Sequence, residues 1–417
     1  MQDDPREVDA DRWHRCATSL NERFHVFSTL FDPTDLQRQM SSLPRDGSRP
    51  LKGLRASLKR TFNWAQLGSG AEDPVSTTLR DSGVCIVGRT NALVAGFAWE
   101  THSEDAGQTL NAANPQWPVG GSSGGDATAV ALGLVSVGVG SDIGGSVRVP
   151  AILQNLLGYK PTSGVLPGGT WDLPTADLSC TGLISRDFGT LRFAISELNR
   201  TRPQVGIWPS PVDSRIFTLD DLIIVEEAPH DVPQALIGRR TRTVSSRLQA
   251  ASRVAVLVWL ASLRPQIEVT LNGPLPSTNI RAFGERLLDV APALAEDRLA
   301  FLRMLVRRHV LTELSHGSAI LAPVMPSVVP FQNFVTGQGQ GFLEKLMTYR
   351  WTLLANVCGL PAVALGGLTD VNIASGYQLI GPPFSDMSLI GWAESLYLSD
   401  GHSTRVAPGA DEGIRDT

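Results

Sequence analysis

The sequence predicts an α/β fold, in which helices cover a central β-sheet. The prediction rests on short apolar or alternating segments that take turns along the chain with segments of helical periodicity. The chain has 417 residues, of which 42% are hydrophobic and 18% charged, so it can bury a large core. One large domain or two smaller ones would fit this length.

The first elements come before residue 60. Apolar residues recur every three or four positions over Asp11–Gln39, which predicts a helix broken at Asp32 and Pro33. Apolar and polar side chains then alternate strictly over Leu54–Lys59. A period of two predicts a strand, with Lys59 on its polar face.

A helix and two strands follow. The helix is predicted to begin with Asp73 as N-cap and Pro74 at the first helical position, and to end at Gly83. The apolar segment Val84–Val87 then predicts a buried strand. The glycine-rich region repeats the pattern, because a helix is predicted over Gly124–Leu134 and a strand over Val135–Gly140. Later core elements are expected at Ala319–Val324, Leu360–Leu365 and Gly376–Gly381, with a helix over Asp386–Leu396.

Between Thr201 and Pro276 the apolar pattern weakens, so a peripheral region that shapes a substrate pocket is expected there. The polar segment 401–417 is expected to form a loose tail. The apolar run Val254–Leu263 is about half the length that a membrane span requires, so it predicts a buried helix or strand and no membrane anchor.

Composition excludes several classes of protein. The net charge of -5 and the scattered Lys and Arg offer no basic face for nucleic acid. Met1–Ala10 is acidic and polar, unlike a secretion signal, so a cytoplasmic location is expected. The cysteines lie far apart and show no metal-ligand spacing, which argues against a disulfide framework or a zinc site: Cys16, Cys85, Cys180 and Cys358.

The segment 120–150 has the composition of a catalytic site. Glycines flank two serine clusters, which contain Ser122 and Ser146. Glycine lets the backbone approach a substrate closely, and its N–H groups can bind a reacting oxygen. The clusters therefore predict a nucleophile, a relay partner and an oxyanion hole. A catalytic serine also needs a base, and no histidine falls within the clusters. A distant histidine could reach the site through the fold, and Lys59 is the alternative if burial lowers its pKa.

These motifs together resemble the amidase signature family, and the resemblance runs from about Phe24 to Leu396. The segment GLRASLKRTF at 53–62 is similar to the family's strand that carries the catalytic lysine, although Arg60 stands where an acidic residue is usual. The other matching motifs are GRTN at 88–91, GGSSGG at 120–125, SDIGGSVRVP at 141–150, GYKPTSG at 158–164, LAPVMP at 321–326, CGLPAVAL at 358–365 and GYQLIGPPFSD at 376–386.

The resemblance implies a fold and an organisation. The expected fold is the amidase signature fold, a three-layer α/β/α arrangement with a large mixed central β-sheet. Residues 1–400 would form a single domain, whose peripheral pocket region spans about 201–316, and 401–417 would be the tail.

The resemblance also implies roles for individual residues. Ser146 would be the nucleophile, Ser122, preceded by a cis peptide bond, the relay, and Lys59 the base. The N–H groups of Ile143, Gly144, Gly145 and Ser146 would form the oxyanion hole. Short polar side chains commonly brace turns, so Ser123 and Asp142 are expected to be structural. Arg148 could contact a substrate carboxylate, but bracing the loop is the favoured role.

The implied reaction is hydrolysis of a carboxamide through an acyl-serine intermediate, without metal or organic cofactor. The expected partner is a small-molecule amide, and a homodimer is the assembly that the resemblance suggests. An acyl- or ammonia-transferring enzyme would use the same residues, and a catalytically inactive scaffold is a third hypothesis.

Overall fold

The computed structural model describes residues 10–41, 54–62, 74–92, 99–166, 178–200, 221–225, 240–273, 278–314, 317–325, 341–367 and 375–399. Its strands are β1 (Phe27–Leu30), β2 (Arg55–Lys59), β3 (Cys85–Thr90), β4 (His102–Ser103), β5 (Gly107–Gln108), β6 (Val137–Asp142), β7 (Leu157–Lys160), β8 (Cys180–Ser185), β9 (Asp221–Ile224), β10 (Arg240–Thr243), β11 (Ser318–Pro323), β12 (Ala362–Gly367) and β13 (Ser375–Ile380). Its helices are α1 (Ala10–Phe24), α2 (Pro33–Ser41), α3 (Pro74–Asp81), α4 (Gly124–Ala131), α5 (Arg148–Leu153), α6 (Phe188–Arg200), α7 (Ser246–Asn272), α8 (Thr278–Val290), α9 (Glu296–Leu314), α10 (Phe342–Met347), α11 (Arg350–Val357) and α12 (Asp386–Ser399).

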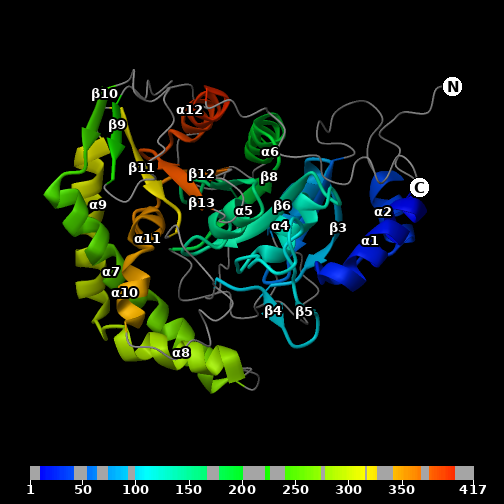
Figure 1. Ribbon diagram of the computed structural model, residues 1–417, viewed down its shortest axis with the longest axis horizontal. Helices are drawn as coiled ribbons and strands as arrows, with labels where there is room; N and C mark the ends of the chain where they lie inside the picture. The colour runs from blue at the N-terminus through cyan, green and yellow to red at the C-terminus, as the bar shows by residue number, and fades with distance from the viewer. Residues whose placement is uncertain are drawn as a thin grey trace.

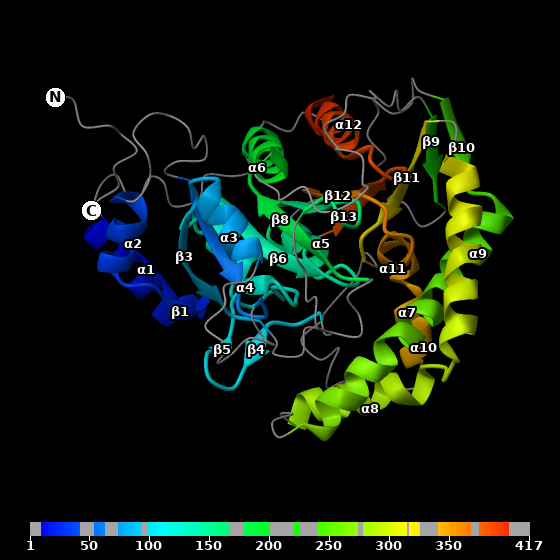
Figure 2. The ribbon, with the colours of Figure 1, turned by 180° about the vertical axis from the view of Figure 1, so that it is seen from behind.

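A mixed sheet of 11 strands runs through the molecule in the order β1-β3-β2-β6-β8-β7-β12-β13-β11-β9-β10. Strands β2, β3 and β6 are parallel, whereas β8 runs antiparallel to both β6 and β7. Helices cover both faces of this sheet (Figures 1 and 2). The α/β/α prediction is therefore confirmed.

The two faces of the sheet have separate cores. Along β12, Ala362 and Ala364 join the cluster that includes α5, α7 and α11, while Val363 and Leu365 join the cluster under α3, α6 and α12. Side chains of a strand alternate between its two faces, so a continuous apolar run serves both cores. A third cluster packs α1 and α2 against α4.

The N-terminal segment differs from the prediction. The first helix ends at Phe24 and not at Asp32, whereas Asp32 does precede the second helix, where its carboxylate accepts a hydrogen bond from the Asp35 N–H at 2.9 Å, as a helix cap does. However, Phe27–Leu30 forms β1, which pairs antiparallel with β3. Four residues are too few for periodicity to separate a strand from a helix, and pairing at the sheet edge decides the outcome.

The polar face of β2 also differs from the prediction, because it is buried. Ser57 and Lys59 are both inaccessible to solvent. The parallel neighbours β3 and β6 enclose the strand, and α4 contacts it. The alternation of apolar and polar residues predicted the strand correctly. It did not predict that the polar side chains of the strand are buried in the protein.

Part of the expected peripheral region is a long helix. Helix α7 contains the run Val254–Leu263 and packs against α9 and α11. By length and composition alone, it is the one helix among the described residues that could cross a membrane, and half of its most apolar window is buried in the fold. A buried core helix of a soluble protein can have the same length and composition, so these two properties are weak evidence that α7 crosses a membrane. Asp73 and residues 401–417, for which a cap and a tail were predicted, lie outside the described residues.

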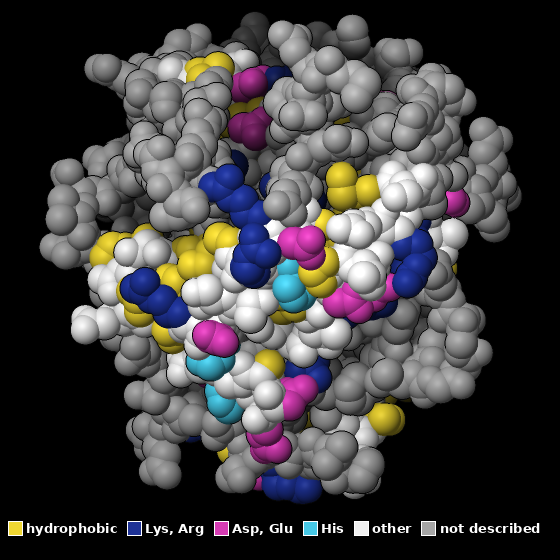
Figure 3. Space-filling view, turned by 90° about the vertical axis from the view of Figure 1, so that its right-hand side faces the viewer, with side chains coloured by type: hydrophobic (Ala, Val, Ile, Leu, Met, Phe, Trp, Pro, Cys, Tyr) yellow, Lys and Arg dark blue, Asp and Glu magenta, His cyan; other side chains and the backbone are white. Residues whose placement is uncertain are grey.

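Figure 3 shows the end of the molecule that carries α1 and α2. On the described part of this face, Lys and Arg side chains lie interspersed with Asp and Glu. Surface ion pairs such as Arg38 with Asp35 fit this mixed pattern.

Candidate active site

Two parallel strands bring the predicted site together. Strand β2 ends at Lys59, and its neighbour β6 ends at Asp142. Ser57 lies opposite Gly138 and Leu58 opposite Val139, so the two carboxyl ends meet at one edge of the sheet. Ser122 lies just before α4, and Ser146 lies in the turn between β6 and α5.

Lys59 lies at the centre of this group and is inaccessible to solvent. Its Nζ donates hydrogen bonds to Ser122 Oγ at 2.8 Å, to Ser141 Oγ at 2.9 Å and to the Ser141 carbonyl at 3.3 Å. The predicted base therefore contacts the predicted relay directly. Ser141 was not predicted, although it opens the motif SDIGGS that carries Ser146.

Burial changes the acidity of Lys59. Removal of the ammonium from water lowers the pKa of Lys59 to about 8, although the charges of Asp126 and Asp142 act in the opposite direction. The neutral amine is therefore accessible near neutral pH, which an exposed lysine does not allow.

Asp126 is an acidic group that the sequence did not predict for the site, and its charge acts on Lys59. It lies in the first turn of α4, and its Oδ1 accepts hydrogen bonds from Ser57 Oγ at 2.8 Å and Thr90 Oγ1 at 2.9 Å. Burial raises the pKa of Asp126 above its usual value, against these hydrogen bonds and the charge of Lys59. The signal for Asp126 in the sequence was its place directly after GGSSGG.

The two serine clusters lie side by side. The Ser123 N–H donates to the Ser146 carbonyl at 3.1 Å, and the peptide bond between Gly121 and Ser122 is cis. A Cβ on Gly121 would lie 2.3 Å from the Glu100 carbonyl oxygen, so only glycine fits there. Ser122 is fully buried and Ser146 is 4% exposed.

Asp142 organises the segment 142–147, which we call the reaction turn. Its Oδ1 accepts the Gly145 N–H at 2.8 Å and its Oδ2 accepts the Val147 N–H at 3.2 Å. Burial by itself would raise the pKa of this carboxyl, but the charge and hydrogen bonds of Arg148 and the Gly145 N–H hold it well below its usual range. A permanently ionised Asp142 thus fixes the backbone around Ser146.

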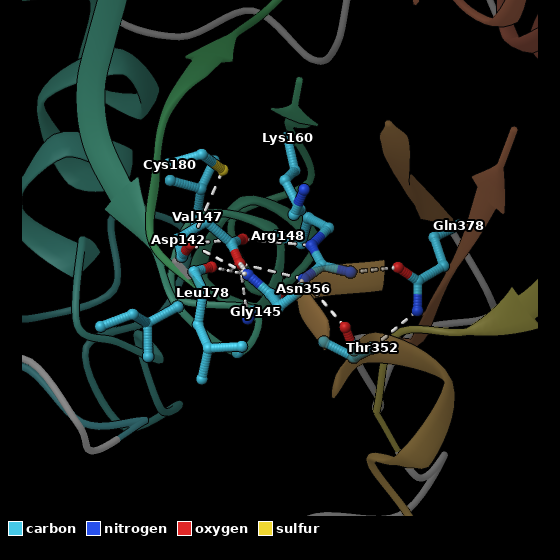
Figure 4. Close-up of polar contacts among 12 residues, drawn as sticks. Asp142, Gly145, Val147, Arg148, Lys160, Leu178, Cys180, Thr352, Asn356 and Gln378 are labelled. Atoms are coloured by element: carbon cyan, nitrogen blue, oxygen red, sulfur yellow. Dashed lines mark hydrogen bonds and ion pairs between the residues drawn. The ribbon is translucent and has the colours of Figure 1, made fainter. Parts of the chain in front are cut away.

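Arg148 connects the reaction turn to the C-terminal part of the fold (Figure 4). The buried guanidinium bonds both Asp142 oxygens, through Nε at 3.1 Å and Nη2 at 2.9 Å. It also donates to Gln378 Oε1 on β13 at 2.6 Å and to Asn356 Oδ1 on α11 at 2.6 Å. Because protein groups surround Arg148, the geometry supports bracing rather than contact with a substrate.

Two details differ from the sequence-based roles. The Ser123 hydroxyl is buried and has no hydrogen-bond partner among the described residues, so its backbone N–H rather than its side chain joins the serine clusters. The Gly145 N–H donates to Asp142, so in this structure it is engaged and not free for an oxyanion. Ile143 and Gly144 lie in the same turn, before Ser146.

Comparison with known proteins finds similarity to amidases and to amidotransferase subunits. The family model for Amidase matches residues 64–250. A glutamyl-tRNA(Gln) amidotransferase subunit of Methanospirillum hungatei is 27% identical over 369 residues, which is 76% of this chain and 83% of that protein. AmiA2 of Mycobacterium bovis, whose name places it among amidases, is 28% identical over 375 residues, 78% of this chain and 73% of that protein.

Solved structures show the same fold. The allophanate hydrolase of Kluyveromyces lactis superimposes with a TM-score of 0.77 over 97% of this chain and 72% of that chain, at 20% identity. At this level of identity the likeness shows a shared α/β fold. The chain is therefore similar to the amidase signature family in its matched segment, in its relatives and in its fold.

Proposed function

We propose that the protein hydrolyses a small carboxamide through an acyl-Ser146 intermediate. The observation that carries the proposal is the buried contact of Lys59 Nζ with Ser122 Oγ at 2.8 Å. A lysine whose pKa is lowered to about 8 can accept a proton that leaves a serine, so Lys59 supplies the base that Ser146 needs.

In the proposed first step, Ser146 Oγ attacks the amide carbonyl carbon. Its proton passes to Ser122 Oγ, while the Ser122 proton passes to the neutral Lys59 amine. The carbonyl oxygen becomes an oxyanion, which the Ile143, Gly144 and Ser146 N–H groups would bind. Gly145 is omitted from this set because its N–H donates to Asp142.

In the proposed second step, the proton returns from Lys59 through Ser122 to the leaving nitrogen. An amide anion is a poor leaving group, so protonation must accompany cleavage of the C–N bond. Ammonia or an amine departs and leaves acyl-Ser146. Water then attacks the acyl group by the same relay, which releases the carboxylic acid and restores Ser146. No step requires a metal or an organic cofactor.

A second candidate function is transfer of the acyl group or of ammonia to an acceptor other than water. The similarity to an amidotransferase subunit supports it, because such a protein belongs to a transferring enzyme. Both functions share the first two steps and differ only in what attacks acyl-Ser146. A catalytically inactive scaffold is disfavoured because Lys59, Ser122 and Ser146 are all present.

A fluorophosphonate probe tests the nucleophile. We expect it to label Ser146 in the wild-type protein, and peptide mass spectrometry would locate the adduct. Ser146→Ala should abolish labelling, whereas Ser252→Ala, which removes a buried serine of α7, should retain it. Absence of an adduct on Ser146 in folded wild-type protein would contradict the proposal.

A panel of small aliphatic and aryl amides separates hydrolysis from transfer. Hydrolysis predicts release of ammonia or amine together with an equal amount of carboxylic acid. Transfer predicts that added hydroxylamine or ammonia captures the acyl group in preference to water, so that hydroxamate or a new amide replaces the acid. Ser146→Ala supplies the blank for both measurements.

A further inference from the structure

Two tryptophans bind the back of the reaction turn. Trp259 Nε1 donates to the Ile143 carbonyl at 2.8 Å, and Trp99 Nε1 donates to the Gly144 carbonyl at 2.9 Å. These carbonyls belong to consecutive peptide units on the way to Ser146. The proposed reaction assigns no role to either indole.

The indoles belong to a buried stack of three rings, which we call the aromatic clamp. Trp99 stacks on Tyr349 with ring centroids 4.3 Å apart and an interplanar angle of 9°, and on Trp259 at 5.9 Å and 15°. Trp99 is 4% exposed, and Trp259 and Tyr349 are each 1% exposed. Trp259 comes from α7 and Tyr349 caps α11, so three distant segments of the chain meet behind the turn.

The hydrogen bonds from the two indoles to the carbonyls determine the direction in which the N–H of each peptide unit points. A peptide unit is planar, and in the trans form its C=O and N–H point in opposite directions. The cis bond of the described chain is at Gly121 and Ser122, so the units of the reaction turn are trans. Trp259, by holding the Ile143 carbonyl, therefore directs the Gly144 N–H away from α7.

The two peptide units are not held equally. The unit between Gly144 and Gly145 is bound at both ends, by Trp99 at its carbonyl and by Asp142 at its N–H. The unit between Ile143 and Gly144 is bound by Trp259 at its carbonyl. The direction of the Gly144 N–H thus depends on Trp259 more than the direction of the Gly145 N–H depends on Trp99.

Packing reinforces this dependence. A Cβ on Gly144 would lie 2.9 Å from Trp259 Cζ2 and 2.9 Å from Leu353 Cδ2. The indole ring therefore packs closely against Gly144, which opposes movement of the turn toward α7.

We propose that Trp259 is a positioning residue of the oxyanion hole, which aims the Gly144 N–H at the oxygen of the reacting group, with Trp99 and Tyr349 holding its indole in place. The proposal rests on Ser146 being the nucleophile, as proposed above. It adds a determinant of rate that lies outside the family's glycine and serine motifs.

The test uses saturable inactivation by a fluorophosphonate, which separates the maximal rate kinact from the binding constant KI. The phosphoryl oxygen of this probe needs the same donors as a carbonyl oxyanion. Trp259→Phe keeps an aromatic ring but loses the N–H, so we expect kinact to fall roughly 10- to 100-fold while KI stays within about 2-fold. Trp99→Phe should lower kinact by about 3-fold or less, because Asp142 still holds that peptide unit.

Trp13→Phe is the matched control. Trp13 is 4% exposed, and its Nε1 donates to the Leu134 carbonyl at 3.0 Å, so the variant loses an equivalent buried hydrogen bond to a carbonyl outside the reaction turn. It should leave kinact unchanged. If phenylalanine at position 259 prevents folding, 3-benzothienylalanine at that position removes the N–H within the shape of tryptophan.

The outcomes are distinguishable. Equal kinact values for Trp259→Phe and Trp13→Phe, with thermal unfolding showing that both are folded, would overturn the positioning role. A rise in KI at constant kinact would also overturn it, since the ring would then bind the probe instead. Wild-type protein without an adduct on Ser146 would refute the proposed nucleophile, and the clamp with it.

Discussion

Lys59 and Asp126 form a buried pair of opposite charge around which the proposed proton transfers take place. Lys59 Nζ contacts Ser122 and Ser141, while Asp126 Oδ1 binds the hydroxyls of Ser57 and Thr90. Among the described residues Asp126 Oδ2 has no hydrogen-bond partner. The free-energy cost of removing this carboxylate from water is therefore only partly offset by hydrogen bonds. The charge of one group therefore controls the proton affinity of the other.

The base should impose a pH dependence on the reaction. Lys59 accepts a proton only when neutral, and its pKa is lowered to about 8. We expect the rate of fluorophosphonate inactivation to be constant above this pKa and to fall about 10-fold per pH unit below it. Lys59→Ala should lower the rate by roughly 100-fold or more, with circular dichroism to verify folding. A near-normal rate in that variant would assign the base to another residue.

Asp126 should set the position of that pH dependence. Its negative charge raises the pKa of Lys59, as does that of Asp142, the other acidic group acting on the amine. Asp126→Asn keeps an oxygen acceptor for Ser57 and Thr90 but removes the charge. We therefore expect the acid limb of the pH–rate profile to move to lower pH.

The matched control for this shift is Asp105→Asn. Asp105 pairs with Arg60 and has a side chain that is 61% exposed, so its removal should not move the limb. An unchanged limb in Asp126→Asn, with lower stability alone, would show that Asp126 is a structural residue.

At the scale of elements, Arg148 joins three of them. It is the first residue of α5, and its guanidinium bonds Asn356 of α11 and Gln378 of β13. Gln378 Nε2 in turn donates to Thr352 Oγ1 at 2.7 Å and to the Pro323 carbonyl at 3.1 Å. A buried charge of this kind is tolerated because the polar groups around it are paired with it.

Removal of this charge should be costly. Arg148→Met leaves Asp142 ionised and buried without its cation, which destabilises a fold by about 3–5 kcal/mol. Arg60→Met breaks an ion pair with exposed Asp105 and should cost about 1 kcal/mol or less. Urea unfolding monitored by circular dichroism measures both free energies of unfolding. Equal losses in the two variants would contradict the bracing role of Arg148.

At the scale of the molecule, one sheet joins strands from the first and the second half of the described chain. Strand β1 forms one edge and β10 the other, and β12 and β13 lie between strands from the first half and strands near the opposite edge. Among the described residues the fully buried charges balance in sign: Lys59, Arg148 and Lys160 against Asp126, Asp142 and Asp386. The strands of both halves share one continuous sheet, and the single domain over residues 1–400 stays a prediction.

A single domain should unfold in one step. We expect the urea transitions followed by tryptophan fluorescence and by far-ultraviolet circular dichroism to coincide, since the cores on the two faces share the strands of one sheet. The clamp variant Trp259→Phe should shift both curves together. Two separated transitions in the wild-type protein would instead indicate independently stable parts.

The sequence was most informative where pattern and local chemistry coincide. Alternation located β2, glycine spacing located Ser122 and Ser146, and the motif set gave the fold. It was least informative where an outcome depends on distant residues. Neither the burial of the polar face of β2 nor the strand β1 follows from local pattern, because sheet neighbours determine both.

The same limit applies to the site. Ser141 stands inside the motif SDIGGSVRVP and Asp126 directly after GGSSGG, yet only the fold shows that both act on Lys59. Trp99 and Trp259 carry no motif at all. Their proposed role depends on contacts between residues that are far apart in the sequence. Trp99 is 45 residues from Gly144, and Trp259 is 116 residues from Ile143.

The aromatic clamp and the Arg148 contacts have a consequence for synthesis of the protein. Ribosomes deliver the chain from its N-terminus, so Lys59, Ser122 and Ser146 are made before Trp259, Asn356 and Gln378. A nascent chain therefore holds every reacting group while the parts that aim them are still missing. Under the proposed reaction, reactivity would begin only when the last strands join the sheet, so an unfinished chain would not attack amides.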